Sequence, residues 1–149
     1  MKKMLSVFDI VKFILTKKKP LSNMNLQKLV YYCQAWSLVW DGKPLFKERI
    51  EAWANGPVVS ELYNLCRGEY FISDIPKGDS NNIISKQRET ILAVLKYYGD
   101  KSPQWLSDLT HSEDPWRKAR EGIPEGVRSN KEITLASMEE YYSSLQEKK

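Results

Sequence analysis

Histidine and cysteine, which supply most metal sites and many catalytic nucleophile–base pairs, are scarce in this sequence. Its 149 residues include one histidine, His111, and two cysteines, Cys33 and Cys66. The cysteines lie in apolar helical patterns and form no Cys-x-x-Cys pair, so the ligand spacing of a structural zinc site is missing. We expect two buried free thiols, no metal ion and no cofactor.

Glycine is also scarce, and the seven residues are scattered without a phosphate-binding pattern such as GxGxxG or GxxxxGK[ST]. The paired carboxylates, Glu113-Asp114 and Glu139-Glu140, are adjacent in the chain and therefore point in different directions on a helix. Any serine or cysteine mechanism would have to use His111. That residue is expected at a helix end, where the helix dipole favours a cationic ring. We therefore predict a non-enzymatic chain with no catalytic residues.

Long apolar runs are missing as well. No uncharged segment approaches the roughly 20 residues that a transmembrane helix needs. Met1-Lys2-Lys3 precedes apolar residues, but Asp9 and Lys12 interrupt them and no small-residue cleavage site follows, so we expect no signal peptide. A length of 149 residues is close to the commonest domain size. We predict one cytoplasmic domain over residues 1–149, with a core of about residues 5–143 and no membrane partner.

Positive charge is unevenly distributed, although the formal net charge is +4. Residues 20–147 hold 15 basic against 18 acidic residues, a net −3. The remaining basic residues lie in the first predicted helix, the turn after it and a C-terminal tail: Lys2, Lys3, Lys12, Lys17, Lys18, Lys19, Lys148 and Lys149. A DNA-binding domain concentrates positive charge on its reading element, whereas most of this chain is net negative. Nucleic acid bound through the first helix is therefore a possible partner, but not the favoured one.

Apolar residues at helical spacing, divided by proline and glycine, predict a mainly α fold. We expect a compact helical bundle of about six to seven helices with at most a short extended segment. A helix that ends at about residue 41 is expected to begin at Asn23 or Asn25, either of which can cap it. This helix is apolar nearly all round, which is typical of a central helix. The other expected features are a helix of about residues 7–17 capped by Ser6 and Asp9, a strand or loop within 43–55, a helix begun by Pro57, a mobile polar loop over 69–82, a helix of about 84–98, helices begun by Ser102-Pro103 and Asp114-Pro115, and a last helix after Ile133.

Aromatic residues are plentiful, with five tryptophans and eight tyrosines. We expect Trp36, Trp40 and Trp105 to lie in the core. Aromatic side chains left at the surface beside charged groups are the usual anchors of protein interfaces. Trp53 lies between Glu51 and Asn55 in the short irregular segment and is the predicted anchor. The full set of predicted partner-binding residues is Arg49, Glu51, Trp53, Tyr31, Tyr63 and Trp116.

Two motifs carry a resemblance to a known family. The first is Leu26-Gln27-Lys28-Leu29-Val30-Tyr31-Tyr32-Cys33-Gln34-Ala35-Trp36, followed by Gly42, Pro44-Leu45-Phe46, Glu51-Ala52-Trp53 and Gly56-Pro57-Val58. The second comprises Leu106, Leu109-Thr110-His111, Glu113, Pro115-Trp116 and Ala119. In this order they resemble the Panacea antitoxin domain, a family that includes SocA-like and GepA-like phage-associated proteins. The resemblance spans about residues 6–142, without a match at 69–82 or in the C-terminal tail.

The resemblance implies a mostly helical, non-enzymatic protein that is encoded beside a toxin, often on a prophage or other mobile element. Such a protein neutralises its cognate protein toxin, commonly by direct binding. A nucleic-acid-binding regulator and an adaptor that presents another protein to a protease remain alternatives, and the oligomeric state is open. The shared motif residues are expected to build the fold: Leu26, Lys28, Leu29, Tyr32, Gln34, Trp36, Gly56, Pro57, Thr110, His111 and Pro115.

Overall fold

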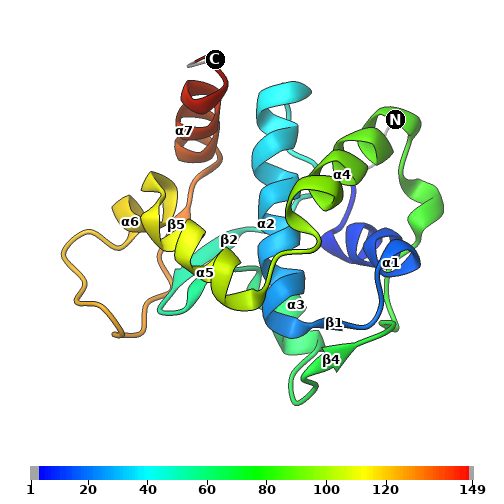
Figure 1. Ribbon diagram of the computed structural model, residues 1–149, viewed down its shortest axis with the longest axis horizontal. Coiled ribbons are helices and arrows are strands. Elements are labelled where there is room, and N and C mark those ends of the chain that lie inside the picture. Colours follow the sequence, from blue (N-terminus) through cyan, green and yellow to red (C-terminus); the bar gives the residue numbers. More distant parts are fainter. Residues whose placement is uncertain (1–3, 148–149) are drawn as a thin grey trace.

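A computed structural model describes residues 4–147 (Figure 1). The terminal lysines of the basic prediction, Lys2, Lys3, Lys148 and Lys149, lie outside the described residues. Helices account for 56% of the structure and strands for 10%, which confirms the mainly α prediction. The helices are α1 Val7–Lys17, α2 Asn23–Trp40, α3 Ser60–Leu65, α4 Ser85–Tyr98, α5 Pro103–Ser112, α6 Asp114–Ala119 and α7 Leu135–Glu147. The strands are β1 Leu21–Ser22, β2 Ile50–Trp53, β3 Gly56–Val58, β4 Phe71–Ile72 and β5 Glu132–Ile133, and a 3-10 turn, η1, spans Ser80–Asn82.

The predicted capping residues of two helices are confirmed. The Ser6 hydroxyl accepts from the Phe8 amide (3.2 Å), and Asp9 accepts from the Ser6 amide (3.0 Å), which is a capping box at the start of α1. Ser102 caps α5 in the same way, with proline at the first helical position. The third cap differs from the prediction. Helix α2 is capped by Ser22 rather than by an asparagine, because Ser22 is the residue with extended backbone before the first helical turn.

Helix α2 is the centre of the fold, as its apolar composition predicts. It packs against α1, α3, α4, α5 and α7, and Figure 1 shows it crossing the middle of the molecule. Every residue from 26 to 35 is buried, including polar ones. The Gln34 amide illustrates why polar groups are tolerated here: it accepts from the amides of Leu45 and Phe46 and donates to the Phe46 carbonyl. Backbone groups of a buried loop need such partners.

The structure has more β structure than the single short segment that we expected. Strands β3, β2 and β5 form a three-stranded antiparallel sheet, and β1 pairs with β4. The β2–β3 hairpin brings Trp53 opposite Gly56. The expectation that Pro57 begins a helix is wrong: Pro57 lies in β3, opposite Ala52, and α3 begins at Ser60. Proline suits this position because β3 is an edge strand, where a missing amide donor is tolerated.

Residues 69–82 are more structured than the polar loop that we predicted. The segment contains β4 and η1, and its isoleucine side chains, at 72 and 75, are buried. Its backbone lies directly on α1: the Asp79 amide donates to Asp9 (2.7 Å), and a Cβ atom added at Gly78 would lie only 2.3 Å from the Phe8 carbonyl oxygen. Buried side chains and close backbone packing therefore attach this segment to the N-terminal helix.

Candidate partner-binding site

The backbone of the β2–β3 hairpin is held by side chains from α5, α6 and the residue after α6. Three consecutive carbonyl oxygens each accept one hydrogen bond: Ala52 from Arg120 Nη1 (3.0 Å), Trp53 from Trp116 Nε1 (2.8 Å) and Ala54 from His111 Nε2 (3.2 Å). We call these three donors the hairpin clamp. The donors also pack on one another, because the indole of Trp116 lies 4.0 Å from the His111 ring and 5.2 Å from the Arg120 guanidinium. The clamp therefore fixes the hairpin from one side.

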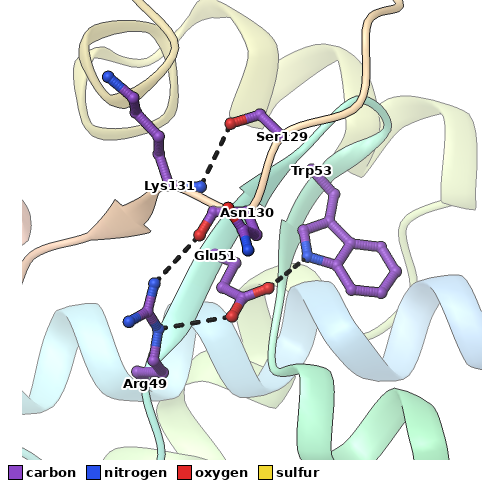
Figure 2. Close-up of polar contacts among 6 residues, drawn as sticks. All are labelled: Arg49, Glu51, Trp53, Ser129, Asn130 and Lys131. Carbon is purple, nitrogen blue, oxygen red and sulfur yellow. Dashed lines mark hydrogen bonds and ion pairs between the residues drawn. The ribbon is translucent and has the colours of Figure 1, made fainter.

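Three alternate residues of the hairpin region, Arg49, Glu51 and Trp53, interact in a row (Figure 2). Glu51 accepts from the Trp53 indole (2.8 Å) and lies 3.4 Å from Arg49 Nε. Arg49 also donates to the Asn130 carbonyl (3.0 Å), which connects the row to the segment after α6. Residues two apart along a strand share one face, which explains how the three side chains meet. We call them the β2 row.

A pocket of about 780 Å³ lies beside the β2 row. Its walls come from the first turns of α2, the hairpin, Tyr63 of α3 and residues 128–130. The rings of Trp53 and Tyr63 meet edge to face at 4.9 Å on its wall. Both side chains are half-buried, so each presents part of its surface to the opening. A volume of this order is typical of a cleft that receives a ligand or a partner side chain.

Lys28 of α2 lines this pocket and is only 2% exposed. Among the described residues, no carboxylate lies within ion-pair distance of its ammonium group and no hydrogen bond is made by it. Burial lowers the pKa of Lys28 to about 8. Its aliphatic stem passes beneath the hairpin: a Cβ atom at Gly56, where φ is +129°, would lie 2.7 Å from Lys28 Cε. Glycine is needed at this turn because φ is positive and because the Lys28 side chain leaves no room for a Cβ atom.

The family model described as "Antitoxin SocA-like, Panacea domain" matches residues 26–117, more than half of the chain. The chain belongs to the SocA-like Panacea domain family. A curated relative, Antitoxin SocA of Caulobacter vibrioides (strain NA1000 / CB15N), is 34% identical over 110 residues. The aligned region covers 65% of this chain and 58% of SocA, so the chain spans less than two thirds of that relative. No solved structure matches the chain.

The two motifs of this Panacea domain are adjacent in space. His111 and Trp116 of the second motif hold the hairpin that carries Trp53 of the first. Other motif residues are buried: Leu26, Leu29, Tyr32, Gln34, Pro57, Thr110 and Pro115. Trp36 is half-buried and donates to the Tyr98 hydroxyl (3.0 Å). These contacts join the parts of the fold to one another.

Three of the predicted partner-binding residues, Glu51, Trp53 and Tyr63, line the pocket, and a fourth, Arg49, pairs with Glu51. Two others do not. Tyr31 is 1% exposed, and its hydroxyl meets that of Tyr142 at 3.0 Å in the core. Trp116 is 7% exposed because its indole packs inward within the hairpin clamp. Neither side chain is at the surface of the Panacea domain, which corrects the prediction for both.

The expected core tryptophans also need correction. Trp40 is 43% exposed and Trp105 is 39% exposed. Trp40 is the last residue of α2, where it stacks on Trp36 at 5.0 Å and donates to Gln146 (2.9 Å). Trp105 lies in the first turn of α5, with the Lys101 ammonium 4.7 Å from its ring. Both are at helix ends, where fewer elements are available to cover a large ring.

A buried carboxylate, Glu113, joins three elements of the domain. Its Oε1 atom accepts from the hydroxyl groups of Tyr32 on α2 and Tyr142 on α7, each at 2.7 Å. Burial raises the pKa of Glu113, and the two hydroxyl donors partly oppose the shift. Its two hydrogen bonds connect α2 and α7 at the start of α6, and the cluster lines none of the larger pockets formed by the described residues.

The remaining chemistry is limited within residues 4–147. Cys33 and Cys66 are free and buried, as predicted. No group of three or more histidine, cysteine or acidic residues in this range could hold a metal ion. None of the described helices combines the length and the apolar character that crossing a membrane requires. On the predicted nucleic-acid surface, Lys12 and Lys18 of the α1 region form ion pairs with Asp74 and Asp100, which reduces the free positive charge.

The sequence did not indicate Arg120 of the hairpin clamp or the pocket residues Asn23, Met24 and Asn130. Nothing in the sequence distinguishes Arg120 from a solvated arginine at a helix end. Lys28 had one usable signal: it is a charged residue within a helix that is otherwise apolar nearly all round. The sequence offered no means of telling that its ammonium group would remain without a partner.

Proposed function

We propose that this Panacea domain is a non-enzymatic antitoxin that binds and neutralises a cognate protein toxin. Membership of the SocA-like family carries the proposal. The binding face comprises the β2 row, Tyr63 and the pocket beside them. We further propose that residues 1–149 act as one domain.

The geometry of the hairpin supports binding through this face. Trp53 offers a half-buried aromatic ring beside a charged row, which is the composition of an interface anchor. The three hydrogen bonds of the hairpin clamp hold its backbone in place before any partner arrives. A preformed surface loses less conformational entropy on association, so more of the contact energy contributes to affinity.

The position of His111 supports the non-enzymatic part of the proposal. Nε2 lies 3.2 Å from the Ala54 carbonyl oxygen, and Nδ1 lies 2.6 Å from the carbonyl oxygen and 3.4 Å from the hydroxyl of Ser107 on the same helix. The ring is half-buried and does not line the pocket beside the β2 row. The histidine acts here as a contact between α5 and the hairpin.

Trp53→Ala tests the proposed face. We expect a folded protein whose affinity for the toxin encoded by the neighbouring gene falls roughly 30-fold, about 2 kcal/mol, because an interface anchor is truncated. Calorimetric binding and growth rescue in cells that express the toxin measure the effect. Trp105→Ala, another partly exposed tryptophan that lies outside the pocket lining, is the matched control and should bind normally. A folded Trp53→Ala variant that still binds and rescues would refute this choice of anchor.

Purified components separate direct neutralisation from adaptor activity. The antitoxin and toxin are mixed with the toxin's target in the absence of any protease. We expect inhibition of the toxin at a stoichiometric ratio. Binding without inhibition, combined with rescue only in cells that contain an active protease, would replace direct neutralisation by the adaptor function.

A further inference from the structure

Lys28 has an unusual position for a lysine. Lysine is seldom fully buried without a partner because moving an unpaired ammonium group out of water is costly. Here the side chain is 2% exposed and lines the pocket, and no described carboxylate pairs with it. Glu51, the acidic residue of the same pocket, is engaged by the Trp53 indole and by Arg49. The ammonium group is therefore available to an anion that enters the pocket.

Other features of the pocket also suit an anion. Asn23 and Lys28 lie in the first turns of α2, where the helix dipole is positive. Arg128, which is exposed, adds a second cation at the rim. The pocket thus offers an unpaired cation close to the positive end of a helix.

We propose that the pocket receives an aspartate or glutamate side chain of the toxin, whose carboxylate pairs with Lys28. This inference rests on the proposed function, since it names the group that the antitoxin recognises. Lys28 joins the β2 row and Tyr63 as a specificity-determining part of the same face.

The charges favour one carboxylate over a phosphate group. Lys28, Arg128 and Glu51 are the charged residues of the pocket lining, with a net charge of +1. A single carboxylate balances that charge, whereas a phosphate dianion would exceed it and would also lie near Glu51. Glu51 and Trp53 of the β2 row line the same pocket as Lys28, so a partner seated on Trp53 lies beside the space that Lys28 borders.

Lys28→Met tests the inference because it keeps an unbranched side chain of nearly the same length and removes its charge. We expect the affinity for the neighbouring gene's toxin to fall roughly 30-fold or more, since one partner of a desolvated charge pair is lost. Lys96→Met, which removes an exposed lysine on α4, is the matched control and should bind as the wild type does. Circular dichroism establishes that both variants are folded.

Substitutions on the toxin identify the partner group. Each surface aspartate or glutamate of the toxin is replaced by its amide and tested against both wild-type antitoxin and Lys28→Met. One toxin replacement should lower the affinity for wild-type antitoxin as much as Lys28→Met does. The same replacement should cause no further loss of affinity for Lys28→Met, because substitutions at two residues in contact do not have additive effects. Additive losses at every acidic position would overturn the inference.

A measurement on the wild-type protein covers the case in which Lys28→Met does not fold. The ¹⁵N-labelled ammonium resonance of Lys28 should shift, and its proton exchange should slow, when the toxin binds. An unchanged resonance in the complex would overturn the inference, as would inorganic phosphate that saturates the free pocket and is not displaced by toxin. If wild-type protein does not bind the toxin at all, both the proposed function and this inference fail. Equal binding by wild type and folded Lys28→Met removes the inference alone.

Discussion

At the scale of single residues, Lys28 shows how a group that we propose to bind a partner can destabilise the protein that carries it. Its ammonium group is desolvated without an opposite charge, and burial lowers its pKa to about 8. In the unfolded chain the same group titrates near 10.4. The folded state therefore binds fewer protons between these values, so the free energy of unfolding should rise as pH increases through this window.

Replacing Lys28 by methionine should therefore stabilise the free protein. We expect Lys28→Met to raise the free energy of unfolding at pH 7 by roughly 3 kcal/mol, the equivalent of the lowered pKa. The advantage should shrink between pH 8 and pH 10.5, as wild-type Lys28 becomes neutral. Urea unfolding of both proteins across this range measures it. A constant difference from pH 7 to pH 10.5 would contradict the explanation by charge.

At the scale of elements, the position of the hairpin depends on donors that come from a distant part of the chain. Trp116 Nε1 supplies the hydrogen bond to the Trp53 carbonyl. Trp116→Phe removes this donor from a buried site and should lower the free energy of unfolding by about 1–3 kcal/mol. Hydrogen exchange of the hairpin amides should also accelerate. Trp40→Phe is the control: its indole bonds to Gln146 at the surface, so we expect a loss below about 1 kcal/mol.

The packing of residues 76–82 on α1 depends on Gly78. This residue has φ +97°, and an added Cβ atom would lie 2.3 Å from the Phe8 carbonyl oxygen. We expect Gly78→Ala to lower the free energy of unfolding by about 3 kcal/mol, through both backbone strain and steric overlap. Gly122→Ala is a matched control with φ +86° and no atom within 4 Å of the new methyl group. A loss of only about 1 kcal/mol is expected there, and thermal unfolding compares the two. Equal losses would show that backbone strain alone accounts for the effect.

At the scale of the whole molecule, Glu113 joins α2 and α7 at the start of α6 through Tyr32 and Tyr142. Burial raises its pKa above the ordinary glutamate value of about 4.3. The folded state therefore retains a proton that the unfolded state has released. The contribution of this group to stability should consequently fall as pH rises from about 4.3 through the folded-state pKa.

Glu113→Gln keeps an acceptor oxygen for the two tyrosine hydroxyls and removes the titration. In wild type, loss of the Glu113 proton should lower the free energy of unfolding above pH 4.3. We expect this decrease to be absent from Glu113→Gln. Glu113→Ala, which leaves both hydroxyls without an acceptor, should lose about 2–5 kcal/mol at all these pH values. Chemical denaturation from pH 4 to pH 8 measures the three proteins. Parallel pH profiles for wild type and Glu113→Gln would show that this carboxylate does not titrate in the window.

Local signals in the sequence determined most of the helices. Ser6 with Asp9, and Ser102 with Pro103, define helix starts because their hydrogen bonds and backbone angles involve neighbours within a few residues. The central position of α2 also follows from its composition, since a helix that is apolar nearly all round must be covered on several sides. The motifs indicated the family for a similar reason, because they are patterns in the chain itself.

The tertiary structure alone decided which aromatic side chains are exposed. From the sequence we expected Trp40 and Trp105 in the core and Tyr31 and Trp116 at the surface, yet the first two are exposed and the last two are enclosed. Proline suits both the first turn of a helix and an edge strand, and the pairing of Pro57 with Ala52 of β2 places it in a strand. Whether Lys28 has a partner likewise depends on groups that only folding brings to the pocket. Burial and pairing depend on contacts between residues far apart in the chain, which no local pattern contains.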